Sequence, residues 1–65
     1  MQFYDLWMKL QYDVETYLKV RDHKQIYYSG CVGVLPVITF EKLEFSFIEK
    51  IYVEKDILYI VLEDK

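Results

Sequence analysis

The C-terminal third of the chain constrains the fold most, because two runs of alternating side chains flank a tight turn. A two-residue loop at Lys55-Asp56 sets a register with three central pairs: Val53 with Leu58, Tyr52 with Tyr59, and Ile51 with Ile60. One face of this predicted hairpin is wholly aliphatic, which predicts the core side: Ile51, Val53, Leu58, Ile60 and Leu62. The other face mixes charge with two tyrosines and is predicted to meet solvent.

The N-terminus predicts a helix over residues 3–12. Its apolar residues recur at the spacing of one helical face: Phe3, Leu6, Trp7 and Leu10. A second stripe beside the first consists of Tyr4, Met8 and Tyr12, and it makes the apolar arc wider than the ~100° that one covered face needs. Since an uncovered apolar stripe is normally an interface, these three residues are predicted to mediate self-association in a homodimer.

The rest of the pattern predicts strands. Period-two alternation favours strands at about 15–21, 26–32, 44–54 and 57–63, the first two joined by a polar loop at residues 22–25. Residues 39–43 fit either a single helical turn capped by Thr39 or an irregular crossover. The predicted fold is a single α+β domain over residues 1–65, with one N-terminal helix packed on a four- to five-stranded antiparallel sheet. The sheet is either open or curled into a small SH3-like barrel.

Charge and cysteine content exclude several classes of protein. The net charge is −3, whereas a general nucleic-acid binder usually shows a basic excess. The longest apolar run, Ile57–Leu62, is far shorter than the roughly 20 residues of a membrane span. The single cysteine rules out an internal disulfide framework and a multi-cysteine zinc site. We therefore expect a cytoplasmic protein with no metal, no cofactor, no membrane partner and no direct nucleic-acid partner.

The strongest nucleophile in the chain, Cys31, lacks a base at the required spacing. It lies among glycines, but the Gly-x-Ser-x-Gly spacing of a nucleophile elbow is absent and no helix follows directly. His23, the sole imidazole, is predicted at the opposite end of the first hairpin. The sequence therefore predicts a buried thiol, a solvated turn histidine and no enzyme activity.

Seven tyrosines are the most informative feature, because tyrosine is enriched at interfaces. Tyr17, Lys19 and Arg21 project to one face of their strand, and Tyr52 and Tyr59 project away from the aliphatic face. The residues predicted to bind a ligand or partner are Tyr17, Lys19, Arg21, Tyr28, Tyr52 and Tyr59. If they are contiguous, they form an aromatic patch edged with cations, suited to a protein partner or to a nucleobase and its phosphate. The alternative is ordinary cross-strand pairing of aromatic rings.

Five stretches carry a resemblance to a known group: Phe3–Leu10, Val20–Asp22, Ile26–Gly30, Leu35-Pro36 and Ile51–Ile60. In this order they resemble short proteins encoded by phages and prophages of Gram-positive bacteria. The resemblance implies a mobile-element origin and a host protein as the partner, met in the cytoplasm of the bacterial host cell.

Three functions stay open on this basis. The first is a non-catalytic protein, similar to anti-CRISPR proteins, that inhibits a bacterial host defence component through a tyrosine-rich surface. The second is a sequestering protein, or sponge, for a nucleotide immune signal. The third is a structural, self-associating module.

Overall fold

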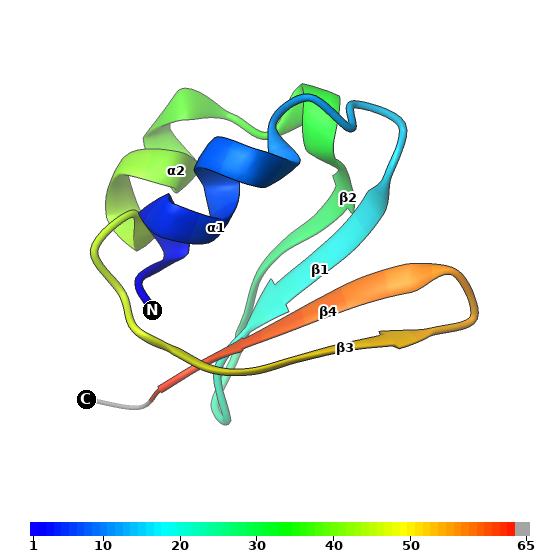
Figure 1. Ribbon diagram of the computed structural model, residues 1–65. Helices are drawn as coiled ribbons and strands as arrows, with labels where there is room; N and C mark the ends of the chain where they lie inside the picture. The colour runs from blue at the N-terminus through cyan, green and yellow to red at the C-terminus, as the bar shows by residue number, and fades with distance from the viewer. Residues whose placement is uncertain (64–65) are drawn as a thin grey trace.

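The structure is a computed structural model that describes residues 1–63, so the last two residues of the predicted 1–65 domain lie outside it. Its elements in chain order are α1 (Phe3–Leu10), β1 (Tyr17–Arg21), β2 (Ile26–Cys31), a 3-10 turn (Val32–Val34), α2 (Val37–Leu43), β3 (Ile48–Glu54) and β4 (Ile57–Leu62). The strands form one sheet in the order β2-β1-β4-β3, and both helices lie on the same side of it (Figure 1). The predicted α+β fold with an N-terminal helix on a sheet is confirmed.

One strand pairing differs from the sequence-based expectation. The two hairpins, β1–β2 and β3–β4, are antiparallel as predicted, but they join through β1 and β4, which run parallel. The sheet is therefore mixed where the sequence predicted an antiparallel one. In the described chain β2 and β3 are the two edges, so the sheet is open and the SH3-like barrel is not confirmed.

The C-terminal hairpin has the predicted register, because its loop has the backbone conformation that a two-residue turn needs. Lys55 and Asp56 have φ values of 52° and 65°, the left-handed pair of a type I′ turn. The twist of a type I′ turn matches the twist of the two strands. This match outweighs the free-energy cost of a left-handed conformation in two residues that are not glycine. The structure pairs Val53 with Leu58, Tyr52 with Tyr59, and Ile51 with Ile60.

The connection between the hairpins departs most from the predicted elements. Residues 37–43 form the complete helix α2, longer than the single turn expected over 39–43, and Pro36 is its N-cap. The strand predicted over 44–54 begins only at Ile48, because residues before it are held by the N-terminus. The Phe3 N–H donates to the Ser46 carbonyl at 2.8 Å, and the Ile48 N–H donates to the Met1 carbonyl at 2.8 Å. Near the N-terminus, α1 ends at Leu10 instead of residue 12, and β1 begins at residue 17 instead of 15.

The core lies between α1 and the two central strands. The largest fully buried side chains are Phe3, Leu18, Val20 and Ile60. The Phe3 ring lies 5.8 Å from the Trp7 ring and 6.1 Å from the Phe40 ring of α2, centroid to centroid. Phe40 thus covers part of the wide apolar arc of α1 and leaves its second stripe exposed. Because isolated helices this short are marginal in water, this packing is what holds both of them.

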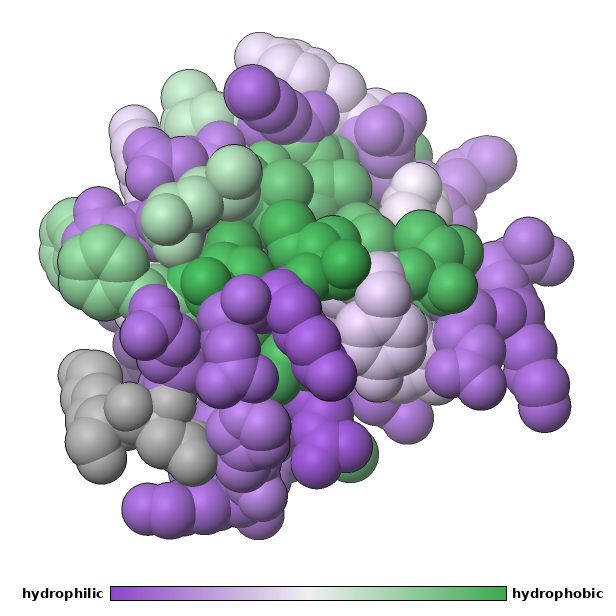
Figure 2. All heavy atoms as spheres, turned by 60° about the horizontal axis from the view of Figure 1, so that its bottom comes forward, coloured by the Kyte–Doolittle hydropathy of each residue, from purple (hydrophilic) through white to green (hydrophobic). Residues whose placement is uncertain are grey.

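The aliphatic face of the C-terminal hairpin is only partly covered, which corrects the predicted core side. Ile60 and Leu62 of β4 are buried, but Ile51 and Val53 of β3 are 40% and 67% exposed. The helices cover β4 and stop short of the β3 tip. Figure 2 brings the lower side of Figure 1 forward and shows apolar side chains gathered in a band across the centre of that view, bordered by hydrophilic ones.

Candidate binding face

The side of the sheet that carries no helix is the candidate binding face. Among the side chains that strand alternation places on this side, opposite the core, are six that we call the tyrosine face: Tyr17, Lys19, Arg21, Lys50, Tyr52 and Tyr59. They come from β1, β4 and β3, three adjacent strands. The parallel pairing of β1 with β4 therefore makes the two groups predicted from the sequence contiguous.

Stacked rings and cations form one row across this face. Tyr59 lies between Lys19 on β1 and Tyr52 on β3, which are its two cross-strand neighbours. The Tyr52 and Tyr59 rings stack with centroids 4.8 Å apart and planes 4° apart. The Lys19 ammonium lies 5.7 Å from the Tyr59 centroid, and the Lys50 ammonium lies 5.4 Å from the Tyr52 centroid, both within cation–π range. These stacking and cation–π contacts hold the two tyrosine rings and the two ammonium groups in a defined arrangement.

A cationic hollow borders the row at the end of β1. It has a volume of about 190 Å³, and its lining is Arg21, His23, Lys50, Tyr52 and Val61. The Arg21 Nε donates to the Asp22 carbonyl at 3.0 Å, which anchors the guanidinium stem beside the hollow. His23 Nε2 lies 2.8 Å from a Glu49 carboxylate oxygen. A guanidinium and an ammonium on opposite sides of a hollow are suited to an anionic group.

Tyr28 does not join the tyrosine face. It pairs with Val20 in the β1–β2 ladder and so lies on the helix-covered side. Its hydroxyl donates to the Cys31 carbonyl at 2.6 Å, and burial raises the pKa of that hydroxyl. Its ring covers Gly30, where a Cβ would come within 2.8 Å of the Tyr28 hydroxyl oxygen. Tyr28 therefore packs across a glycine on the core side and is not available to a ligand on the tyrosine face.

The second predicted set, which we call the helix stripe, consists of Tyr4, Met8 and Tyr12. Their side chains are 43%, 46% and 80% exposed. The Tyr4 ring lies 6.4 Å from Phe40, centroid to centroid, so α2 covers one side of it. Tyr12 lies past the end of α1, in the turn that leads to β1.

Cys31 and His23 lie at opposite ends of the first hairpin. Cys31 pairs with Tyr17 at the start of β1, whereas His23 belongs to the loop after β1 ends. Within residues 1–63, no group of three or more histidine, cysteine, aspartate or glutamate side chains could hold a metal ion. Neither described helix has the length and apolar character needed to cross a bilayer.

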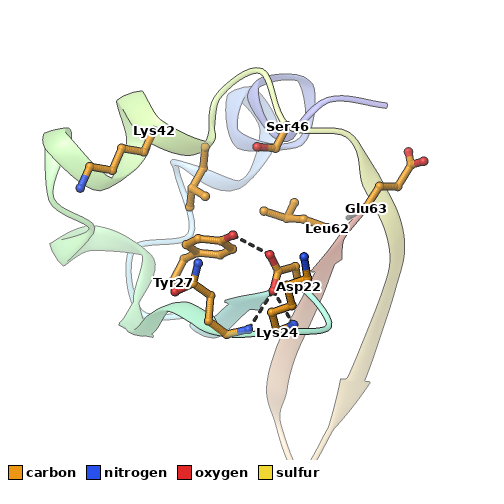
Figure 3. A pocket seen from close by; sticks show the side chains of 9 residues that line it. Asp22, Lys24, Tyr27, Lys42, Ser46, Leu62 and Glu63 are labelled. Carbon is orange, nitrogen blue, oxygen red and sulfur yellow. Dashed lines mark hydrogen bonds between the residues drawn. The ribbon is translucent and has the colours of Figure 1, made fainter. Parts of the chain in front are cut away.

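Sequence reasoning missed the role of Asp22, which organises the loop between β1 and β2. Its Oδ1 accepts hydrogen bonds from the N–H groups of Lys24 at 2.7 Å and Gln25 at 2.8 Å, and its Oδ2 accepts one from the Tyr27 hydroxyl. Figure 3 shows the Tyr27 hydroxyl and the Asp22 carboxylate facing each other in a hollow of about 310 Å³, below Lys42 of α2. The signal was available, because aspartate at the start of a polar loop often bonds to the backbone that follows it.

Acid stability is expected to depend on Asp22. Hydrogen bonds from Tyr27, Lys24 and Gln25 hold the pKa of its carboxyl below the ordinary 3.8. A carboxyl whose pKa is lower in the folded state stabilises the fold at pH values above its pKa in the unfolded state. This stabilisation is lost as the pH falls through the pKa of the folded state. We expect the melting temperature to fall below about pH 4. Asp22→Asn should lower the melting temperature at neutral pH and weaken its dependence on pH below about pH 4. Glu41→Gln on the exposed side of α2 should leave that pH dependence unchanged. Equal pH dependence in both variants would contradict this role.

Comparisons of the chain with protein-family models, curated proteins and solved structures found no match.

Proposed function

We propose that the protein is a non-catalytic binding protein that inhibits a bacterial host defence component through the tyrosine face. The observation that carries the proposal is the continuous row of stacked tyrosines and cations on the side of the sheet that no helix covers. The resemblance to phage and prophage proteins favours a target in host immunity. We expect inhibition of the anti-CRISPR kind, in the cytoplasm of the bacterial host.

The charge of the face indicates the surface that it binds. The whole chain carries −3, yet three cations, Lys19, Arg21 and Lys50, lie on this side of the sheet against one β3 carboxylate, that of Glu54. An acidic protein surface with apolar side chains between its carboxylates would complement the tyrosine face. Opposite charges speed association and fix the orientation of the two proteins. Tyrosine and arginine are also the residue types that supply most binding energy at interfaces.

The test is relief of defence in cells. The chain would be expressed in bacteria that carry one defence system at a time, including CRISPR–Cas systems and systems that signal through nucleotides, and phage plaquing would be counted. The proposal expects plaquing to recover on a host with a protein effector, and a pull-down from that host at mild salt to retain the effector. Unchanged plaquing across the panel would contradict it.

A nucleotide sponge is the second candidate, and the cationic hollow favours it. The hollow places Arg21 and Lys50 around space suited to a phosphate, directly beside the Tyr52 ring. Both ring faces of Tyr59 are already occupied by its row neighbours, and Lys50 lies over the Tyr52 ring, so a base would have to displace Lys50 or stack on Tyr17. This limited stacking surface is why we rank the protein partner first.

Thermal unfolding distinguishes the sponge from the protein inhibitor. A ligand at 100 times its Kd stabilises a protein by about 2.7 kcal/mol. For a domain of this size that is a rise of about 10–20 °C in melting temperature. A panel of cyclic and modified nucleotides that gives no rise would remove the sponge reading and leave the protein inhibitor standing.

Self-association is part of the proposal as well, in the form of a homodimer, and a purely structural module is the third reading. The exposure of the helix stripe and of β3 supports self-association, because apolar side chains left on a surface are normally covered by a partner. Light scattering at two protein concentrations tests it, and a strict monomer at the higher concentration would contradict it.

A further inference from the structure

The outer edge of β3 is open over residues 50–54, the regular part of the strand between the bulge at residues 48–50 and the Lys55-Asp56 turn, and we call this part the β3 edge. The N-terminal residues cover only what precedes it: Met1 accepts from the Ile48 N–H, and Gln2 forms a bridge with Phe47. Beyond Ile48, β3 is the last strand of the described sheet on this side. An open edge is a template for another strand unless bulges, prolines or charge block it.

The hairpin turn determines which backbone groups the β3 edge offers. A β-turn joins its first and fourth residues, so Glu54 and Ile57 form a hydrogen-bonded pair around Lys55-Asp56. Hydrogen-bonded and non-hydrogen-bonded pairs then alternate along the ladder. Ile51 and Val53 fall in the non-hydrogen-bonded positions. Their N–H and C=O groups therefore point away from β4, toward the open side.

The side chains of the same two residues are apolar and exposed. Ile51 and Val53 are β-branched, lie on the helix-covered side of the sheet, and are 40% and 67% exposed. Outward-pointing backbone groups and exposed β-branched side chains thus coincide at one place. On the opposite side, the Tyr52 ring stacks on Tyr59, and the Lys50 ammonium lies 5.4 Å from the Tyr52 centroid.

We propose that two copies of the chain pair antiparallel through their β3 edges, about a twofold axis at Tyr52. This rests on the part of the proposed function that makes the protein a homodimer. In this register Ile51 lies opposite Val53 of the partner subunit and forms hydrogen-bonded pairs with it, as the backbone directions require. Lys50 lies opposite Glu54 of the partner subunit, and the twofold axis repeats this pair. The opposed charges of the regular edge are then complementary.

The neighbouring registers lack this complementarity. An axis at Ile51 keeps the backbone directions but sets Glu49 against Val53 of the partner subunit. An axis at Val53 sets Ile51 against Lys55 of the partner subunit. Shifts of a single residue are excluded as well, because they bring outward-pointing backbone groups against residues whose groups point inward. Only the axis at Tyr52 satisfies backbone, apolar and charged groups together.

The pairing joins two four-stranded sheets into one and extends the tyrosine face across the axis. Tyr52 lies opposite Tyr52 of the partner subunit in a non-hydrogen-bonded pair, where side chains come closest. The row of Lys19, Tyr59 and Tyr52 then continues into its symmetric copy. On the other side, Ile51 and Val53 of both copies cover one another, which removes the most exposed aliphatic part of β3 from water.

Charge reversal in one chain tests this pairing, with the dimer dissociation constant read by analytical ultracentrifugation. Lys50→Glu or Glu54→Lys alone sets like charges opposite each other twice per dimer, and we expect dimer affinity to fall about tenfold in each. The double variant restores opposite charges and should recover wild-type affinity. Val53→Pro removes an N–H that only the partner uses, and should abolish the dimer while circular dichroism stays that of the folded chain.

Met8→Lys distinguishes the β3 pairing from the helix-stripe interface that the sequence predicts, and under the β3 pairing it should leave the dimer dissociation constant unchanged. A dimer that survives Val53→Pro and the single reversals but dissociates in Met8→Lys would overturn the β3 pairing, while the homodimer itself would stand. A wild-type chain that is monomeric at every concentration would overturn both. Because the charged positions lie exposed on β3, the reversal variants fold even if the proline variant does not.

Discussion

Phe3→Ala is expected to leave much of the protein unfolded at 25 °C. Phe3 is fully buried, and its ring contacts both Trp7 of α1 and Phe40 of α2. Truncating a buried phenylalanine costs about 3–5 kcal/mol. A domain of this length has a total stability of about 3–10 kcal/mol, so the loss is a large part of it. Urea or thermal unfolding followed by circular dichroism measures the change.

The matched control for that variant is Phe45→Ala, the same chemical change at a side chain that is 69% exposed. It should alter stability by no more than about 0.5 kcal/mol, as exposed substitutions usually do. Comparable losses in the two variants would contradict the placement of Phe3 at the centre of the core.

The double variant Tyr52→Ala/Tyr59→Ala is expected to lose most of the affinity for the partner. Tyrosines at the centre of an interface contribute about 2–4 kcal/mol when truncated, a weakening of about 30- to 1,000-fold. The fold should survive, because a cross-strand pair contributes only about 0.2–1 kcal/mol. Surface plasmon resonance against the captured effector, with circular dichroism as the folding check, measures both effects.

Tyr4→Ala/Tyr12→Ala removes the same number of rings from the helix stripe and should keep the affinity. If this variant loses affinity and the Tyr52/Tyr59 variant keeps it, the partner binds the helix side of the molecule and the tyrosine face has no binding role.

Local patterns predicted the elements whose contacts are local. The C-terminal register followed from strict alternation around Lys55-Asp56, and α1 followed from the helical spacing of Phe3, Leu6 and Trp7. In contrast, α2 begins with Val37, Ile38 and Thr39, which are β-branched and poor helix formers. Its helical state depends on Phe40 packing against Phe3 and Trp7, a contact between distant parts of the chain that alternation does not reveal.

The candidate site was predicted in two halves. Period two placed Tyr17 and Lys19 on one face of β1, and Tyr52 and Tyr59 on one face of the second hairpin. That the halves meet depends on the parallel β1–β4 pairing, which local sequence does not specify.

Two residues were assigned differently by the structure. Lys50 alternates with Tyr52 and so shares its face, which strand alternation alone indicates. A four-residue loop at residues 22–25 predicts Tyr28 opposite Lys19, but the bulge between Val20 and Arg21 sets Tyr28 opposite Val20, on the core side.

The most direct test of the central claim is nuclear magnetic resonance mapping of the isotope-labelled protein with the captured effector. We expect the perturbed amides to lie in β1, β4 and β3, around Lys19, Tyr52 and Tyr59, with the amides of α1 and α2 unchanged. Perturbations confined to α1 and α2, with the three strands unaffected, would contradict the claim that the protein binds through its tyrosine face.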